Sequence, residues 1–374
     1  MIKERKLIGV YYMGKIEVLK ANFGERSYKL LYGRRLLERL SQHVPKSFGG
    51  SRFLVISNRA VKNLFGKRIE AALQNKCLEW LTIPDGEKHK NLDTVYRIYK
   101  SLATHNMDKE SYVVALGGGV LQDLVTYSCA TYRRGIPLIQ IPTTVLAQAD
   151  IGIGGCAVNH EMGKSLIGTV YQPVLVVNDI DTLDTLPKKQ LINGRAEIIC
   201  KVVCLGGEKI KKIKKDVVTF SQDKDLLINY IKLSAKHKKE IVEKDETGSK
   251  GTRIILDYGH TVTYALETLT GYRILHGFGL GIGMHIAAVL SCMKGHLSKE
   301  NVVFLKSLIE ISGLPTQLPQ NIHVGKLIDQ MKFDQKTVNG KIRFVLLKNF
   351  GEPFLSGTMG RDEISDAIQK SREY

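Results

Sequence analysis

Short apolar runs alternate with amphipathic segments over the first half of the chain. Residues 53–57 and 78–83 are apolar runs of strand length, and residues 60–74 between them place apolar positions at helical spacing. A strand, a helix and a second strand in this order are typical of a parallel sheet, whose strands are buried on both faces. The pattern therefore predicts an α/β fold over this half.

The same rhythm continues to about residue 177. Further strands are predicted over residues 112–116, 137–141 and 174–177, and further helices over residues 92–103 and 121–133. A turn over residues 84–90 opens the first of these helices. Residues 1–33 alternate apolar and polar side chains, which predicts short antiparallel strands added at the sheet edge, with apolar positions at Ile8, Val10, Tyr12, Ile16, Val18 and Leu19.

Beyond Thr182 the β-branched runs stop and helical periodicity takes over. Helices are predicted over residues 188–205, 226–243 and 279–294. The sequence contains no internal repeat or low-complexity linker, so the change of rhythm alone marks the boundary. We expect an α/β domain over residues 1–180 and a mainly helical domain over residues 181–374.

Composition excludes a disordered chain and leaves the reason for the charge open. Of 374 residues, 43% are hydrophobic and 25% charged, and Lys and Arg exceed Asp and Glu by 55 − 37 = 18. Such an excess attracts nucleic acid, a membrane surface or small anionic substrates. The densest basic run, residues 209–215, spaces two isoleucines three apart among lysines, which predicts an amphipathic helix with solvated lysines. Nucleic-acid binding is therefore not our expectation.

The cysteines and the N-terminal residues indicate a cytoplasmic protein. Six cysteines are scattered without a CxxC spacing, which favours reduced thiols that behave as small hydrophobic side chains. The first fifteen residues contain no apolar run of signal-peptide length, and no continuous run of about eighteen apolar residues occurs that would cross a membrane.

Three glycines after the strand over residues 112–116 are the first candidate binding feature. Glycines at this place let backbone N–H groups approach phosphate oxygens at the start of the next helix. A tight turn alone would explain them equally well. Asp123 follows four residues later and suits a ribose or nicotinamide amide, although an acid in the first helical turn is favoured by the helix dipole anyway. A second glycine-rich loop, closed by a lysine, follows over residues 150–165.

Glu197, His260 and His276 are the candidate metal ligands of the second half. One carboxylate and two imidazoles leave coordination positions open, as a divalent cation needs in order to hold a substrate hydroxyl and lower its pKa. The alternative is that these are hydrogen-bonded polar residues without a ligand.

A series of motifs in constant order resembles the 3-dehydroquinate synthases and their relatives, the sugar-phosphate cyclases. The motifs are GGGVxxD, YxRGIP, QIPTTVLAQxD, VNHxxGK, IGxxYQP, DTLxTLP, AExI, GHT and HG, and the resemblance runs from Asn58 to about Leu347. It implies a Rossmann-like NAD-binding domain, a helical metal-binding domain, an active site between them, and a homodimer.

The resemblance also assigns roles to individual positions. It implies that NAD is bound by Asn58, Glu87, Lys90, Gly118, Gly119, Asp123, Thr143, Thr144 and Thr182. Zinc or cobalt would be bound by Glu197, His260 and His276. The substrate would be contacted by Asp150, Lys164, Lys238, Arg253 and Asp257, and by Arg134 from the second subunit.

The chemistry implied is a redox-neutral ring closure. In such enzymes NAD transiently oxidises a secondary alcohol, phosphate leaves by β-elimination, the hydride is returned, and an intramolecular aldol closes the carbocycle. The metal stabilises an alkoxide, and cationic side chains bind phosphate and carboxylate.

Several positions depart from the 3-dehydroquinate synthase pattern. The loop over residues 154–159 is one residue shorter and lacks a lysine, and the lysine three residues after Glu197 is replaced, with Lys201 one step further on. The altered positions are Cys156, Ser165, Cys200, Asp257, Tyr264, Phe278, Gln335 and Glu352.

Because of these departures, the sequence does not identify the substrate. Asp257 stands where some cyclases of secondary metabolism, such as 2-deoxy-scyllo-inosose and 2-epi-5-epi-valiolone synthases, carry an acid. Lys238 and Arg253 resemble the carboxylate-binding pair of the 3-dehydroquinate synthases. A metal-dependent polyol dehydrogenase with net hydride transfer, a decayed pocket without turnover, and a polyanion-binding protein are the remaining alternatives.

Overall fold

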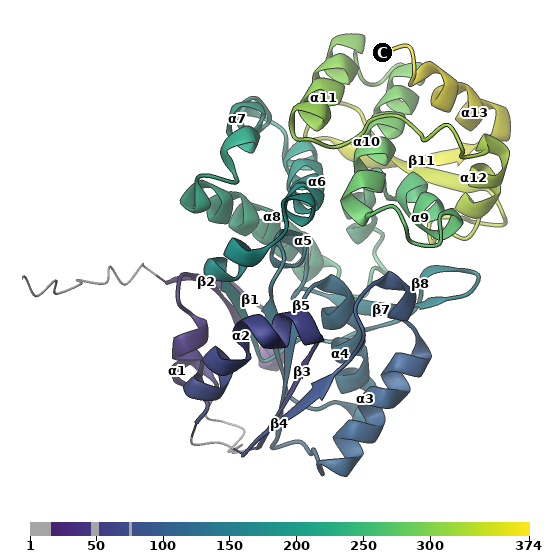
Figure 1. Cartoon of the computed structure of the whole chain (residues 1–374). Coiled ribbons are helices and arrows are strands. Elements are labelled where there is room, and N and C mark those ends of the chain that lie inside the picture. The colour runs from purple at the N-terminus through teal and green to yellow at the C-terminus, as the bar shows by residue number, and fades with distance from the viewer. Residues whose placement is uncertain (1–15, 46–51, 75–76) are drawn as a thin grey trace, which may run out of the picture.

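A seven-stranded sheet forms the first half of the protein. The computed structural model describes residues 16–45, 52–74 and 77–374 (Figure 1). The strand order is β1-β2-β9-β6-β5-β3-β4, and only β1 runs antiparallel to its neighbour. The strands are β1 (Glu17–Ala21), β2 (Tyr28–Gly33), β3 (Arg52–Ser57), β4 (Cys77–Thr82), β5 (Tyr112–Gly117), β6 (Leu138–Pro142) and β9 (Leu175–Asp179). The α/β fold predicted from the apolar runs is confirmed.

Helices cover both faces of this sheet because successive side chains of each strand point to opposite faces. Phe53 and Val55 of β3 belong to a core with α2, whereas Leu54 and Ile56 belong to a second core with α3 and α4. The helices of this half are α1 (Leu40–His43), α2 (Arg59–Ala72), α3 (Leu92–Thr104), α4 (Gly119–Thr131) and α5 (Val145–Asp150). The continuous apolar runs thus have the burial expected of parallel strands.

The antiparallel pair expected at the edge is formed by β1 and β2. Ile8, Val10 and Tyr12 lie outside the described residues, whereas Val18 and Leu19 lie in β1. Beyond β1, β2 pairs in parallel with β9, so the hairpin extends the main sheet.

The second glycine-rich segment is a hairpin for most of its length, and its prediction as a loop was wrong there. Strands β7 (Gly155–His160) and β8 (Gly163–Val170) pair antiparallel after a short bend over residues 151–154. Cys156 and Val158 alternate with less buried neighbours, which is the pattern of a strand packed on one side. The hairpin lies at the seam between the two halves, where β8 contacts α9 (Figure 1).

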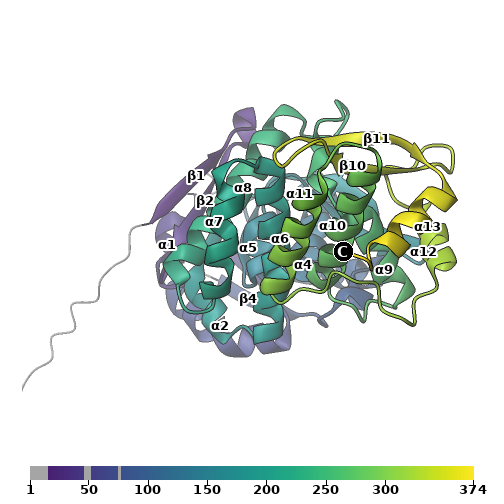
Figure 2. The same cartoon turned by 90° about the horizontal axis from the view of Figure 1, so that it is seen from above.

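Helices dominate the second half, as predicted. Seen from above, α8, α6, α10 and α9 follow one another in a row, each packed against the next (Figure 2). The helices are α6 (Lys188–Leu205), α7 (Glu208–Asp216), α8 (Lys224–Lys244), α9 (His260–Leu269), α10 (His276–Met293), α11 (Lys299–Ile311), α12 (Val324–Met331) and α13 (Arg361–Lys370). A hairpin of β10 (Ile342–Leu347) and β11 (Pro353–Met359) completes this half.

Two helices of this half, α7 and α10, test what was expected of the basic run and of the longest apolar segments. Ile210 and Ile213 of α7 are buried while its lysines project outward, so the amphipathic helix predicted from the basic run is confirmed. By length and composition α10 could cross a membrane, but 78% of that window is buried inside the protein. Its apolar character is accounted for by the core that it forms with α6, α9 and α11.

Close backbone contacts hold the start of α9 against the middle of α10, and the first turn of α10 against α6. A methyl group on Gly283 would lie 2.1 Å from the carbonyl oxygen of Gly259, and one on Gly277 would lie 1.9 Å from that of Asn193. Gly259 itself has φ of +80°, a conformation that favours glycine. These contacts fix the helices on which His260 and His276 are the first residues.

Candidate active site

Three helices bring Glu197, His260 and His276 together at the seam. Glu197 lies within α6, and the two histidines begin α9 and α10. Glu197 Oε1 is 3.3 Å from Nε2 of His260 and 3.1 Å from Nε2 of His276. One ligand atom of each residue lies within 4.8 Å of the other two. The spacing is that of a three-ligand cation site.

The outer nitrogens of both histidines are held by other groups. Nδ1 of His260 donates to the carbonyl oxygen of Tyr258 at 3.1 Å, and Nδ1 of His276 lies 3.1 Å from Oε2 of Glu267. Such bonds keep a proton on Nδ1, so that Nε2 of each imidazole is the nitrogen available to bind a metal. This is how proteins orient metal-ligating histidines. The donor set of two imidazoles and a carboxylate therefore fits a divalent metal with open positions.

Neighbouring charges also shift the pKa values of Glu197 and His276 in this cluster. Burial would raise the pKa of Glu197, but Lys201 and the two histidines hold it well below its usual range. Burial alone would lower the pKa of His276, yet the carboxylates of Glu267 and Glu197 together raise it to about 9. The group is thus a carboxylate with two imidazoles whose protons a cation can replace.

Asp150 is bound by two lysines beside the metal cluster. Lys238 donates to its backbone oxygen at 2.6 Å and to Oδ2 at 2.9 Å, and Lys201 lies 3.2 Å from Oδ1. Lys201 also donates to Glu197 Oε2 at 3.1 Å, so it joins Asp150 to the metal ligands. Burial would raise the pKa of Asp150, but Lys238 and Lys201 lower it to about 2.

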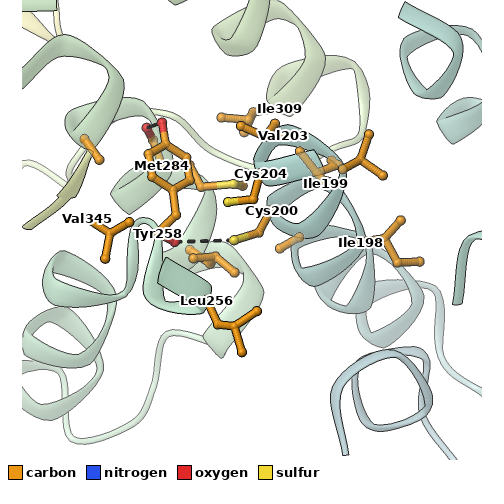
Figure 3. Close-up of a cluster of buried hydrophobic side chains, with 14 of the residues drawn as sticks. Ile198, Ile199, Cys200, Val203, Cys204, Leu256, Tyr258, Met284, Ile309 and Val345 are labelled. Carbon is orange, nitrogen blue, oxygen red and sulfur yellow. Dashed lines mark hydrogen bonds between the residues drawn. The ribbon is translucent and has the colours of Figure 1, made fainter. Parts of the chain in front are cut away.

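Lys201 is a site residue that the sequence analysis did not assign. Position 200 aligned with the lysine of related proteins, but Cys200 is fully buried in the core and donates its thiol to the oxygen of Tyr258 at 3.4 Å (Figure 3). Residues three and four positions apart both lie on the same helical face as Glu197. The spacing of four residues between Glu197 and Lys201 was therefore the sequence feature that could have predicted Lys201 as a site residue.

Lys164 and Glu267 join the hairpin to α9. Lys164 of β8 donates to Glu267 Oε1 at 2.6 Å and lies 3.7 Å from Glu87 Oε1. The amide of Asn159 donates to the same Glu87 oxygen at 3.0 Å. Glu267 and Asn159 were not predicted, although Glu267 follows His260 by seven residues, two helical turns on the same face. A small pocket here is lined by Lys164, Ser165, Thr261, Tyr264, Asp334 and Gln335.

The carboxyl ends of three adjacent strands carry the positions predicted to bind NAD. Asn58 follows β3, Gly118 follows β5 and Thr144 follows β6, and each is the N-cap of a helix. Gly118 and Thr144 are in close contact, because a methyl group on Gly118 would lie 3.2 Å from Cγ2 of Thr144. This edge of a parallel sheet, where helix N-termini gather, is the place at which folds of this kind commonly bind anions.

Other predicted NAD positions lie close to this edge or beneath it. Lys90 forms an ion pair with Asp123 at 2.5 Å and lies 3.9 Å from Glu87. The amide N–H of Thr143 donates to the oxygen of Gly117. Thr182 is buried, and its hydroxyl donates to Asp179 and accepts from Gln148. Gly119 begins α4.

Arg253 and Asp257 are the two ends of a short 3-10 helix that precedes α9. Asp257 Oδ2 accepts from Gln335 at 2.8 Å and lies 3.4 Å from the buried ammonium of Lys336. Arg253 donates through NH1 to the oxygen of Glu246 at 2.8 Å, and its guanidinium lies against Gly154. Lys336 thus adds a cation near the site that the sequence analysis did not assign.

Arg134 lies apart from the other predicted substrate residues. It lines a surface pocket with Arg26, Lys109 and Tyr171. Both Arg133 and Arg134 have positive φ, 48° and 58°. No hydrogen bond or ion pair among the described residues joins Arg134 to the metal cluster.

The remaining altered positions differ in their burial and in the side chains that they contact. Tyr264 is 5.3 Å from His260 between ring centroids, and the ammonium groups of Lys164 and Lys336 lie 5.6 and 5.9 Å from its ring. Cys156 is buried in β7. Ser165 has φ of +58°, Phe278 packs on the core beside Lys189, and Glu352 is exposed in the turn between β10 and β11.

The two-domain fold with a parallel sheet and a helical second half occurs in solved structures of both cyclases and alcohol dehydrogenases. The solved structure of 2-deoxy-scyllo-inosose synthase complexed with carbaglucose-6-phosphate, NAD⁺ and Co²⁺ is similar with a TM-score of 0.85 and 22% identity, covering 95% of this chain and 99% of that one. NADH-dependent butanol dehydrogenase A from Thermotoga maritima is similar with a TM-score of 0.67 and 14% identity, over 96% and 99%.

Sequence similarity then separates the two groups. Family models described as 3-dehydroquinate synthase N-terminal and C-terminal match residues 80–193 and 194–337. The 3-dehydroquinate synthase of Thermodesulfovibrio yellowstonii is 38% identical over 361 residues, covering 95% of this chain and 100% of that protein. That of Methylococcus capsulatus is 39% identical over 346 residues, or 91% and 95%. The chain belongs to the 3-dehydroquinate synthase family.

Proposed function

We propose that the protein is an NAD- and divalent-metal-dependent sugar-phosphate cyclase of the 3-dehydroquinate synthase type. Its substrate is a seven-carbon keto acid phosphate, from which it eliminates phosphate before an intramolecular aldol closes the ring. The observation that carries this proposal is the convergence of Nε2 of His260 and of His276 on Glu197, beside the lysines that bind Asp150 and Glu267. The similar proteins are 3-dehydroquinate synthases, and the similarity covers nearly their whole length.

The cofactors would be held on opposite sides of the seam. Residues 1–180 would bind NAD through the helix N-termini after β3, β5 and β6, with Lys90, Asp123 and Glu87 nearby. Residues 181–374 would bind zinc or cobalt through Glu197, His260 and His276. When bound, the metal lowers the pKa of a substrate hydroxyl and NAD accepts the hydride from its carbon.

Buried lysines supply the charge that phosphate elimination requires. The leaving phosphate departs with the electron pair of its C–O bond, so cations that are already in place stabilise it without reorganisation. Lys164 and Lys336 lie at the Tyr264 ring, and each is paired with carboxylates that keep it protonated. Their pKa values are raised by those carboxylates despite burial. We assign them to the phosphate side of the pocket.

The carboxylate of the substrate would be bound by Lys238 and Arg253. Both approach the same bend from α8 and the segment before α9: Lys238 contacts Asp150 and Arg253 lies against Gly154. Asp150 holds Lys238 in place through two oxygens. Because Lys201 binds the other oxygen of Asp150, the substrate groups and the metal ligands share one ion network.

A homodimer would complete the site. Arg134 has no contact with the metal cluster of its own chain among the described residues, and its backbone conformation is one that non-glycine residues rarely adopt. Strained backbone of this kind is common at functional sites. We therefore propose that Arg134 reaches the substrate of a second subunit, and that the enzyme is cytoplasmic and acts on small molecules.

A second candidate is a cyclase with a changed substrate, and Asp257 favours it. Its carboxylate is bound to Gln335 and Lys336 and so neutralises a cation near the pocket. A substrate without a carboxylate needs fewer cations than a keto acid. A polyol dehydrogenase shares the fold but would accumulate NADH.

Phosphate release separates these candidates. The protein, with NAD and zinc or cobalt, is given 3-deoxy-arabino-heptulosonate 7-phosphate, sedoheptulose 7-phosphate and glucose 6-phosphate in separate reactions. Release from the first alone supports the proposal, and release from one of the others supports the changed substrate. Silence with all three, while metal binding is intact, would refute the cyclase activity.

A further inference from the structure

A hydroxyl and an amide from outside the metal cluster hold the bend that follows Asp150. The hydroxyl of Tyr28, on β2, donates to the carbonyl oxygen of Gly152 at 2.5 Å and lies 3.1 Å from Oε1 of Gln172. The same Gln172 oxygen accepts from the N–H of Gly154 at 3.3 Å. Both Tyr28 and Gln172 are buried. Gly152 and Gly154 of the bend are therefore both held by one pair of side chains.

The amide nitrogen of Gln172 continues this contact into an ion pair. It donates to Glu246 Oε1 at 2.8 Å, and Arg26 forms a bidentate pair with both Glu246 oxygens at 2.8 Å. The backbone oxygen of Glu246 accepts from Arg253, whose guanidinium lies against Gly154. The bend is thus held between the β1–β2 turn and the segment that carries Arg253.

The bend depends on these contacts for its position, because its two glycines are conformationally permissive. Gly152 and Gly154 have φ of +90° and +99°, and a methyl group on Gly152 would lie 2.9 Å from Val176. Asp150 precedes the bend directly, and both its backbone oxygen and its carboxylate accept from Lys238. The position of the backbone at 150 therefore decides where the Lys238 ammonium lies.

We propose that Tyr28 and Gln172 are positioning residues of the substrate site, which act through the bend over residues 151–154 on Asp150 and Lys238. The proposal deepens the proposed function and rests on it for the role of Lys238. The proposal gives the β1–β2 hairpin a role in the substrate site, although this hairpin is far in sequence from the residues proposed to contact the substrate.

The chain offers a matched control for the test. Tyr32 lies four residues after Tyr28 on β2, is fully buried, and its hydroxyl has no hydrogen-bond partner among the described residues. Tyr28→Phe and Tyr32→Phe each remove one buried hydroxyl from the same strand. Each variant is compared with the wild type by steady-state phosphate release and by peptide-level amide hydrogen exchange over residues 151–155.

Tyr28→Phe is expected to speed exchange over residues 151–155 and to raise KM about five- to tenfold, the loss expected for one hydrogen bond, with kcat changed less than twofold. Gln172→Leu should do the same, and the double variant should cost less than the two effects multiplied, because both act on one bend. Tyr32→Phe should leave exchange and KM unchanged.

Three results would overturn the proposal: unchanged exchange in Tyr28→Phe, faster exchange with unchanged KM, or equal effects in Tyr32→Phe. Exchange does not depend on turnover. If the wild type releases no phosphate, the proposed function fails, whereas exchange still decides whether Tyr28 holds the bend.

Discussion

Glu267 faces His276 with its Oε2 atom 3.1 Å from Nδ1 of the imidazole, and this contact decides which nitrogen His276 turns toward Glu197. The other oxygen of Glu267 binds Lys164 of the β7–β8 hairpin. One carboxylate thus contacts both a candidate metal ligand and the lysine that we assign to the substrate, so the two halves of the proposed site are linked.

Replacing Glu267 should therefore weaken metal binding without removing a ligand. Glu267→Gln takes away the charge that orients His276, and loss of such an outer partner lowers metal affinity by about 10- to 100-fold. Competition with a chelator of known affinity measures the effect. Glu300→Gln, at an exposed position of α11, is the control and should bind metal as the wild type does. Equal affinity in the two variants would contradict the orienting role.

His260→Ala should abolish metal binding and turnover together. Nε2 of His260 is one of three ligand atoms, and the remaining two cannot hold a divalent cation in an open site. His296→Ala, at an exposed histidine, should change neither property. Metal content by atomic emission and phosphate release decide the matter, and activity retained in His260→Ala would disprove the metal assignment.

Asp150 should make stability depend on pH below about 5. Burial raises its pKa, but Lys238 and Lys201 lower it to about 2, below the unfolded value of about 3.9. A depressed carboxyl pKa stabilises the folded state above the unfolded pKa, and this contribution is lost as pH falls toward the folded pKa. Between pH 5 and pH 3 the loss is about 1 kcal/mol.

The comparison of wild type with Asp150→Asn isolates this group. The variant is expected to be less stable at pH 5, and its free energy of unfolding should fall less steeply toward pH 3. Urea denaturation at pH 5, 4 and 3 supplies both slopes. Parallel slopes would mean that Asp150 is not held ionised by the two lysines.

Close packing of α9 on α10 should be sensitive to a single methyl group. Gly283→Ala would place Cβ 2.1 Å from the Gly259 oxygen, so the helices must separate, at a cost of about 3 kcal/mol or more. Gly357→Ala meets no atom within 4 Å and should be nearly neutral. Thermal and urea unfolding measure the difference, and similar stability of the two variants would argue against the close approach.

The α/β half could be predicted from sequence because its strands are buried on both faces. Leu54 and Ile56 enter one core and Phe53 and Val55 the other, so the run is apolar throughout and stands out from its surroundings. The β7–β8 hairpin was missed because glycines at 152, 154 and 155 outweighed the weak alternation after them.

The candidate metal ligands were predicted from residue type and resemblance, whereas the side chains that contact them were not. Glu267 and Lys201 have no unusual local sequence, and their roles arise where α9 meets β8 and where α6 meets Asp150. The resemblance pointed to position 200, but packing of α6 against Tyr258 buries Cys200 (Figure 3). Lys201, one residue further on, donates to Glu197 instead. Such choices depend on neighbouring elements that sequence spacing does not reveal.

A redox-neutral elimination and ring closure fixes the stoichiometry of the reaction, which a single measurement can determine. Inorganic phosphate and the absorbance of NADH are recorded together while the protein, with NAD and zinc or cobalt, consumes 3-deoxy-arabino-heptulosonate 7-phosphate. We expect one phosphate for each substrate consumed and no net NADH. Accumulation of NADH without phosphate would contradict it.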